Sequence, residues 1–103
     1  MKQWIEAADE GTFERVDRQE VEVAPGRRVG IFKVGAEYFA VDAICSHEHA
    51  SLLMGDVDGH EVMCPLHGAR FDLRTGKHLT LPAVRPVGSY RVKAENGKIY
   101  VEI

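Results

Sequence analysis

Two pairs of cysteine and histidine constrain this chain more than any other feature. Cys45 and His47 form a C-x-H pair, Cys64 and His67 form a C-x-x-H pair, and sixteen residues separate the pairs. The spacing alone leaves His49 as an alternative to His47, because Cys45 could act with either histidine. Two soft thiolates and two imidazoles on two loops are a ligand set for a metal centre rather than for a disulfide. The sequence therefore predicts a chain that is organised around a metal site.

The composition is that of a soluble globular protein. The chain has 103 residues, of which 45% are hydrophobic and 28% charged, so we expect one domain over residues 1–103. Its net charge of −3 argues against a nucleic-acid partner, since such proteins neutralise phosphates with basic side chains. The sequence shows no secretory leader after Met1 and no apolar run near the roughly 20 residues of a membrane span. We therefore expect a cytoplasmic protein without a membrane partner.

Residues 1–42 predict short strands separated by turns, because apolar and polar residues alternate and no long segment has a 3.6-residue period. Ala24-Pro25-Gly26 and Gly35-Ala36 are the expected turns. Ala7-Ala8-Asp9-Glu10 could form one helical turn. The expected strands include Thr12–Val16, Val21–Val23, Arg28–Val34 and Tyr38–Val41.

Residues 43–83 differ from the preceding part, because glycine, proline, histidine and aspartate interrupt short apolar pieces. Asp58-Gly59 predicts a two-residue hairpin turn between Val57 and residues 60–63. Ala69–Leu73 predicts a further short strand, and residues 74–76 turn the chain back. We expect this region to be a small lobe inserted between strands of a larger scaffold, with a fold that depends on the metal.

Residues 84–103 predict a terminal hairpin with one buried face. Asn96-Gly97 is a strong signal for a type I′ turn. The residues that alternate with polar neighbours on either side of it are Tyr90, Val92 and Ala94, then Ile99, Val101 and Ile103. The whole pattern predicts an all-β fold, an antiparallel sandwich or barrel scaffold that carries the lobe at about 43–83.

Three motifs in the metal-site stretch carry a family resemblance. C-S-H at 45–47, C-P-L-H-G at 64–68 and F-D-L-R-T-G at 71–76 resemble the signature of Rieske-type [2Fe–2S] proteins. The chain is most similar to the small soluble ferredoxins of bacterial ring-hydroxylating dioxygenase systems. The resemblance implies one [2Fe–2S] cluster, with Cys45 and Cys64 on the inner iron and His47 and His67 on the outer iron near solvent. It selects His47 over His49.

The alternative metal is structural zinc, which also accepts two cysteines and two histidines. Zinc fingers follow the order C-x₂₋₄-C and then H-x₃₋₅-H, whereas here each loop combines one cysteine with one histidine. The order therefore disfavours a zinc-binding interaction module. A visible spectrum distinguishes the two, because an iron–sulfur protein is coloured and a zinc protein is not.

The resemblance implies a one-electron carrier and not an enzyme. In such systems an NAD(P)H-dependent flavoprotein reductase loads the cluster, and a terminal ring-hydroxylating oxygenase of aromatic hydrocarbon catabolism unloads it. The alternative is the Rieske domain or subunit of an oxygenase complex, whose catalytic iron would need two histidines and a carboxylate. After the four ligands only His49, His60 and His78 remain, all on or near the lobe. Catalysis within this chain is therefore disfavoured.

Several other residues near the ligands have expected roles. Gly68 and Gly76 should adopt backbone conformations closed to other residues. Asp72 and Arg74 could pair as structural anchors. His49, His60 and His78 are expected at the surface, and Met54 and Met63 are expected to pack. Leu52 and Leu53 could either shield the cluster or belong to the core. High-potential members of the family have a serine and a tyrosine that donate to cluster sulfurs, and this chain has Ala69 and Phe71 at those positions.

Overall fold

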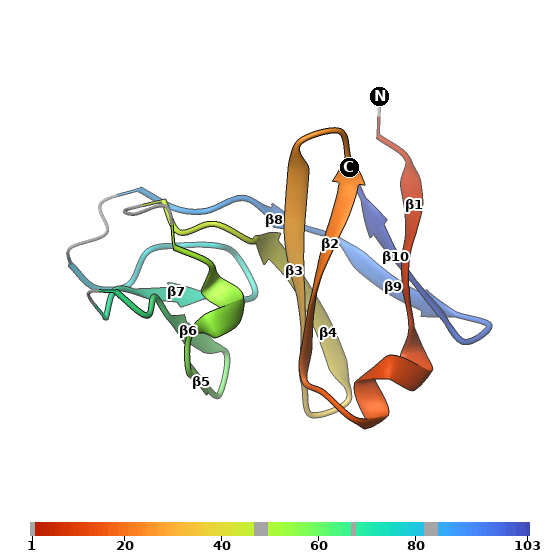
Figure 1. The fold of residues 1–103 in the computed structure, drawn as a ribbon, viewed down its shortest axis with the longest axis horizontal. Helices are drawn as coiled ribbons and strands as arrows, with labels where there is room; N and C mark the ends of the chain where they lie inside the picture. The colour runs from red at the N-terminus through yellow and green to blue at the C-terminus, as the bar shows by residue number, and fades with distance from the viewer. Residues whose placement is uncertain (1, 47–49, 67, 82–84) are drawn as a thin grey trace.

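Segments in which apolar and polar residues alternate form strands, and these strands pair into three antiparallel sheets (Figure 1). The computed structural model describes residues 2–46, 50–66, 68–81 and 85–103. The strands and 3₁₀ helices within these ranges are, in chain order, β1 (Trp4–Asp9), η1 (Glu10–Glu14), β2 (Arg18–Ala24), β3 (Arg27–Val34), β4 (Glu37–Asp42), η2 (Leu52–Met54), β5 (Val57–Asp58), β6 (Glu61–Met63), β7 (Arg70–Asp72), β8 (Ser89–Tyr90), β9 (Val92–Glu95) and β10 (Lys98–Glu102).

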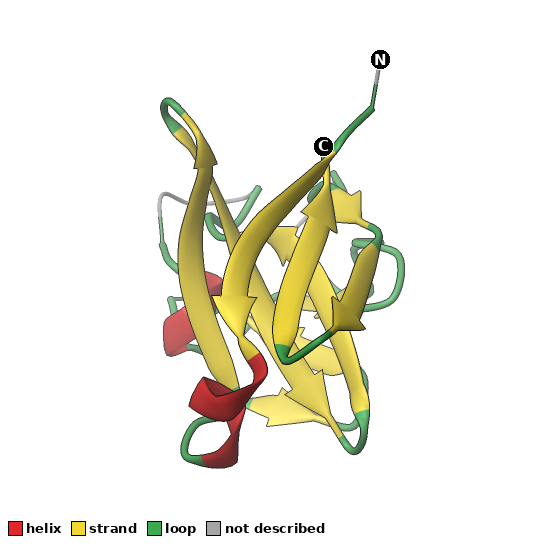
Figure 2. Cartoon of the chain, turned by 90° about the vertical axis from the view of Figure 1, so that its right-hand side faces the viewer, coloured by secondary structure: helices red, strands yellow, loops and turns green. Residues whose placement is uncertain are grey.

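The three sheets follow one another along the long axis of a molecule that measures 39 × 31 × 18 Å. An outer sheet has the strand order β1-β10-β9, and the middle sheet has the order β2-β3-β4-β8. The third sheet, β5-β6-β7, forms the small lobe with η2 at the opposite end. In Figure 2 the outer sheet lies in front of the middle sheet. The expected all-β fold, a scaffold with a small added lobe, is therefore confirmed.

The middle sheet has apolar side chains on both faces, so it separates two cores. On β3 the buried residues Ile31 and Phe32 point to opposite sides, as neighbours on a strand must. The scaffold core, between the middle and outer sheets, contains Phe13, Val23, Val29, Ile31, Ala40, Ile99 and Val101. The lobe core, between the middle sheet and the lobe, contains Phe32, Val41, Cys45, Leu52, Val62, Cys64, Ala69, Phe71, Leu73 and Val87.

The terminal hairpin has the predicted turn. Asn96 and Gly97 have φ values of 53° and 78°, both positive as a type I′ turn requires, and Glu95 pairs with Lys98 around them. Ile99 and Val101 are fully buried. The strand before the turn differs from the prediction: β8 pairs with β4 and β9 pairs with β10, so the chain crosses between two sheets at Arg91. Ala94, which the alternation placed on the buried face, is exposed.

Two predictions for the N-terminal segment are wrong. Thr12–Val16 is not a strand, because residues 10–14 form the 3₁₀ helix η1. Within η1 only Phe13 is buried, and its ring centroid lies 5.3 Å from that of Tyr38. A strand would bury every second residue, and burial of one side chain does not require that pattern. The expected helical turn at Ala7–Glu10 instead belongs largely to β1, which pairs with β10 through a register shift between Glu6 and Ala8. Pairing with β10 overrides the helix propensity of alanine.

The hairpin in the lobe is displaced by one residue from its predicted position. Asp58 pairs with Glu61, so the connecting residues are Gly59 and His60 rather than Asp58 and Gly59. Gly59 has a φ of 61°, which suits the first central position of a type II′ turn. Within the described ranges, no helix is long and apolar enough to cross a membrane.

Candidate metal centre

The two cysteines begin two loops that close in the same way. Cys45 follows β4, and its N–H donates to the carbonyl of Ala50 at 2.9 Å. Cys64 follows β6, and its N–H donates to the carbonyl of Ala69 at 2.6 Å. In both loops the acceptor lies five positions after the cysteine. Each closure therefore brackets the histidine positions that the sequence predicts as ligands.

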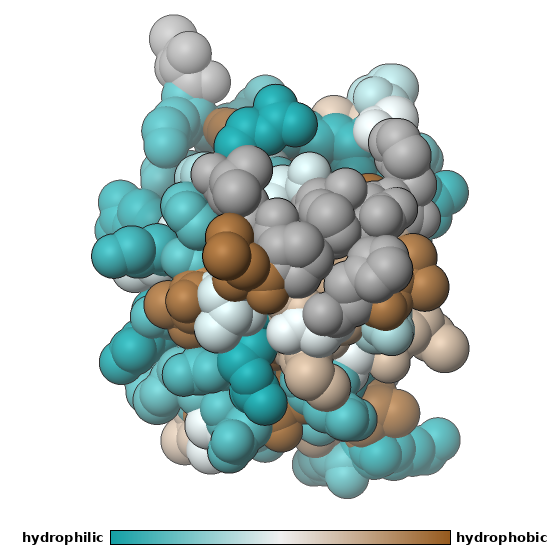
Figure 3. All heavy atoms as spheres, turned by 90° about the vertical axis from the view of Figure 1, so that its left-hand side faces the viewer, coloured by the Kyte–Doolittle hydropathy of each residue, from teal (hydrophilic) through white to brown (hydrophobic). Residues whose placement is uncertain are grey.

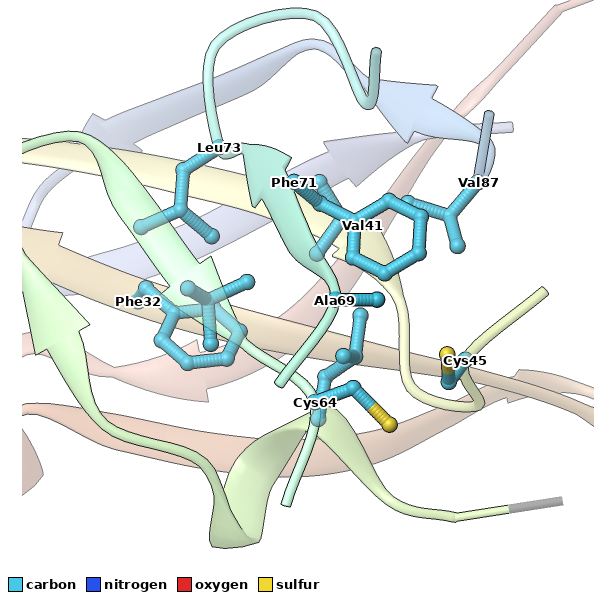
Figure 4. Close-up of a cluster of buried hydrophobic side chains, with 10 residues drawn as sticks. Phe32, Val41, Cys45, Cys64, Ala69, Phe71, Leu73 and Val87 are labelled. Atoms are coloured by element: carbon cyan, nitrogen blue, oxygen red, sulfur yellow. The ribbon is translucent and has the colours of Figure 1, made fainter. Parts of the chain in front are cut away.

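Both cysteine side chains are buried in the lobe core. Cys45 is 4% exposed and Cys64 is 0% exposed. In Figure 4 the two residues lie at one edge of this core, and the sulfur of Cys64 points toward the side on which Cys45 lies. The predicted ligands His47 and His67, and the alternative His49, lie outside the described residues. The structure thus brings the two predicted thiol ligands into one buried region.

A third segment, residues 85–88, lies beside the first loop and contributes to the lobe core. The Ser46 hydroxyl, directly after Cys45, donates to the carbonyl of Arg85 at 2.6 Å. The Val87 N–H donates to the carbonyl of Gly76 at 2.9 Å, and Val87 is part of the lobe core. Gly76 has a φ of 77°, and a Cβ there would lie 2.1 Å from the Val87 carbonyl oxygen, so only glycine fits. The prediction for Gly76 is confirmed, and Gly68 likewise has a positive φ of 75°.

Asp42, the last residue of β4, fastens this third segment to the scaffold. Its carboxylate accepts the Gly88 N–H at 2.7 Å and the Tyr90 hydroxyl at 2.5 Å, and its own N–H donates to the Gly88 carbonyl at 2.9 Å. The Arg27 guanidinium lies 5.2 Å from the Tyr90 ring centroid. Burial, together with the hydrogen bond to Asp42, raises the pKa of Tyr90. Sequence reasoning missed Asp42, because its partners lie more than forty positions away.

The turn after β7 is held by the Asp72–Arg74 pair that the sequence suggested. The Asp72 carboxylate accepts the Arg74 backbone N–H at 2.8 Å and its Nε and Nη2 at 3.1 and 3.0 Å. The hydrogen bond from the Arg74 side chain holds the pKa of Asp72 below its usual value.

The burial of other residues near the ligands agrees with the sequence prediction at some positions and differs at others. His60 and His78 are half-buried rather than at the open surface, and the His60 ring meets Phe39 edge-on at 5.4 Å. Leu52 is fully buried in the lobe core, one of the two roles that the sequence left open. Met54 is 77% exposed, so the expectation that it packs is wrong. It is the last residue of η2, and its backbone N–H rather than its side chain joins the local turn, donating to Ser51.

The donor set and its surroundings fit a cluster with one buried and one exposed side. The thiols are buried in an apolar core, whereas Ser46, Pro65, Leu66 and Gly68 on the same loops are half-buried or exposed. Thiolates favour iron–sulfur ligation, and imidazoles on the open side of each loop would complete a mixed ligand set.

Comparisons with known proteins identify the family. A model of the Rieske [2Fe-2S] domain matches residues 3–91. The chain belongs to the Rieske [2Fe–2S] family. This Rieske chain is 43% identical over 84 residues to the ferredoxin component of the p-cumate 2,3-dioxygenase system of Pseudomonas putida, covering 81% of the chain and 71% of that relative. The family assignment confirms the resemblance, and with it one Rieske-type cluster.

Solved structures of Rieske proteins have the same fold. The ferredoxin of carbazole 1,9a-dioxygenase from Nocardioides aromaticivorans IC177 superposes with a TM-score of 0.88 at 33% identity, covering 96% of each chain. A chain in a complex of reduced oxygenase and oxidized ferredoxin of carbazole 1,9a-dioxygenase superposes with a TM-score of 0.87 at 28% identity, covering 95% of this chain and 91% of that one.

Proposed function

We propose that this Rieske chain is the ferredoxin component of a bacterial aromatic-ring dioxygenase system, an electron carrier rather than a catalyst. The observation that carries the proposal is the match to an isolated ferredoxin over 96% of both chains, at 33% identity. The relative from the p-cumate system is also a ferredoxin component. By its chemistry the cluster, when bound, stores and releases a single electron.

The residues proposed to hold the cluster are Cys45 and Cys64 on the inner iron and His47 and His67 on the outer iron. The two buried cysteines and the matching loop closures support the first pair. The histidine pair rests on the family motifs C-S-H and C-P-L-H-G. In this arrangement the chain buries the thiolates, excludes water from them, and presents the imidazole side to a partner.

Analysis of the purified protein tests the proposal. We expect two irons and two labile sulfides per chain and a visible absorption spectrum. One zinc per chain and a colourless protein would contradict it. The variant His47→Ala should abolish or badly destabilise the cluster, whereas His49→Ala should leave the visible spectrum intact. The reverse result would reassign the ligand in the first loop.

The proposed partners are an NAD(P)H-dependent flavoprotein reductase and a terminal ring-hydroxylating oxygenase, in the cytoplasm. Figure 3 shows apolar side chains on the end of the molecule that carries the loops. Exposed apolar residues adjoin the loops in the chain: Ile44 is 41% exposed, Leu66 57% and Leu81 78%. Such a surface suits a small, transient encounter with a redox partner. Stopped-flow reduction of a purified oxygenase by the reduced protein tests this, and no transfer to any ring-hydroxylating oxygenase would refute it.

A further inference from the structure

Arg18 extends from the scaffold onto the lobe. It pairs across the middle sheet with Phe32, so both side chains lie on the face that the lobe covers. Its guanidinium carbon lies 5.4 Å from the centroid of the Phe32 ring, and its side chain is 22% exposed. A cation in this position is partly desolvated, so its hydrogen bonds matter more than those of a surface arginine.

Every nitrogen of the Arg18 guanidinium has an acceptor. Nη1 donates to the carbonyl of Leu53 at 3.2 Å and also to the carbonyl of Gly55. Nε and Nη2 donate to the Asp17 carboxylate at 2.9 and 3.3 Å. The planar fork therefore joins a scaffold carboxylate to two lobe carbonyls, and a lysine ammonium cannot reproduce this geometry.

The two carbonyls lie where the first cysteine loop leads to the second. Just before Leu53, the Leu52 N–H donates to the carbonyl of Ala43 at 2.7 Å. Gly55 packs against the backbone of Met63 so closely that a Cβ would lie 1.8 Å from the Met63 carbonyl oxygen. Met63 directly precedes Cys64. The Arg18 guanidinium, by fixing the position of Gly55, therefore also restricts the backbone at the start of the second loop.

We propose that Arg18 is a positioning residue for the metal centre, which holds the two cysteine loops at a fixed separation and closes the space beneath them to water. This inference rests on the proposed ligand assignment. Without the Arg18 guanidinium, the Leu53 and Gly55 carbonyls lose their hydrogen-bond donor, and η2 is no longer joined to β2 by these bonds. Arg18 covers Phe32, which belongs to the same lobe core as both thiols, so water that enters there stabilises the more negative, reduced state of the centre. Replacement of Arg18 by lysine, which keeps the positive charge and removes only the branched hydrogen bonding, should therefore raise the reduction potential.

The test compares Arg18→Lys and Arg18→Gln with the wild type and a matched control, all as purified iron-loaded proteins. The control is Arg28→Lys, since Arg28 lies on the neighbouring strand β3 and donates to Glu20 at 2.9 Å with a side chain that is 56% exposed. The measurements are voltammetry, visible circular dichroism, and hydrogen exchange of peptides covering 43–56 and 62–70. Arg18→Lys, which keeps the positive charge, should show a raised potential, and both Arg18 variants should show about tenfold faster exchange in these peptides, the factor for one lost charge-assisted hydrogen bond. Arg28→Lys should match the wild type.

A purely structural role would lower the midpoint of thermal bleaching in Arg18→Lys but leave its potential, dichroism and loop exchange unchanged, and that result would overturn the proposal. Arg18→Lys keeps the charge and the aliphatic stem, so it decides the question even if Arg18→Gln does not fold. A wild-type protein that contains zinc instead of iron would contradict the proposed function. The exchange comparison would still test Arg18, which keeps the two failures distinct.

Discussion

At the scale of single residues, the second loop lacks two hydroxyl donors. Ala69 and Phe71 are fully buried in the lobe core together with Cys45 and Cys64. The family resemblance places a serine and a tyrosine at these positions in high-potential members, where they donate to cluster sulfurs. Reduction adds negative charge, so such donors stabilise the reduced form more than the oxidised form. Without them, we expect a potential near the low end of the Rieske range, roughly −150 mV.

The double variant Ala69→Ser, Phe71→Tyr should raise the reduction potential. A hydrogen bond to a charged group contributes about 1.5–3 kcal/mol, and if about half of it differs between redox states each donor adds roughly 30–65 mV. Voltammetry measures the shift. Phe39→Tyr is the control, because Phe39 is a half-buried ring on β4 that meets His60 and should leave the potential unchanged. A clearly positive wild-type potential, or no rise in the double variant, would show that another interaction sets the potential.

Asp72 gives the turn after β7 a defined dependence on pH. Its pKa in the folded protein is lowered, mainly by the hydrogen bond from Arg74, so the pair stabilises the fold fully above the unfolded pKa of about 3.9. That contribution is lost as the pH falls through the lowered folded pKa. The free energy of unfolding of the wild type should exceed that of Asp72→Asn at pH 7, and the difference should shrink below pH 4 or so. A difference that stays constant down to pH 3 or so would contradict the assignment.

At the scale of elements, the sequence predicts β2, β3, β4 and the terminal hairpin, because alternation and turn residues act locally. It fails where a distant partner decides the outcome, as when Ala8 and Asp9 pair with Ile99 and Lys98 of β10 and so belong to a strand. The site shows the same division. The cysteines are recognisable from their motifs, whereas Arg18 and Asp42 are not, since their partners are distant in sequence. No local pattern marks a side chain whose role is to join two elements.

The contact between Asp42 at the end of β4 and Tyr90 in β8 can be tested by removing one oxygen. Tyr90→Phe keeps the ring but deletes the hydroxyl that donates to Asp42 at 2.5 Å, so it should cost about 1.5–3 kcal/mol of unfolding free energy. Tyr38→Phe is the control, because its hydroxyl donates to Glu10 at 3.3 Å and its loss should cost less than about 1 kcal/mol. Urea unfolding of the iron-loaded proteins compares them. Equal losses would mean that the Asp42–Tyr90 hydrogen bond contributes no more to stability than the Tyr38–Glu10 hydrogen bond.

At the scale of the whole molecule, the two cores differ in what supports them. The scaffold core lies between the outer and middle sheets, whose longest strands have six and eight residues. The lobe core is closed on its far side by β5, β6 and β7, which have two, three and three residues. Strands this short pair too few backbone groups to be stable by themselves. We therefore expect the lobe to depend on the middle sheet and on the proposed ligands in its loops, and the scaffold core to be independent of those ligands.

Removal of the metal should consequently unfold the two parts unequally. After iron is extracted with a chelator under reducing conditions, the cysteine loops lose the bonds that join them, and ligand binding no longer contributes to folding. Hydrogen exchange should become fast across about 43–83, while β3 and β10 stay protected by the scaffold core. Exchange-mass spectrometry of the iron-loaded and iron-free proteins measures this, and reconstitution with iron and sulfide should restore protection in the lobe. Loss of protection throughout the chain would show that the scaffold also needs the metal, and unchanged protection in the lobe would show that neither part does.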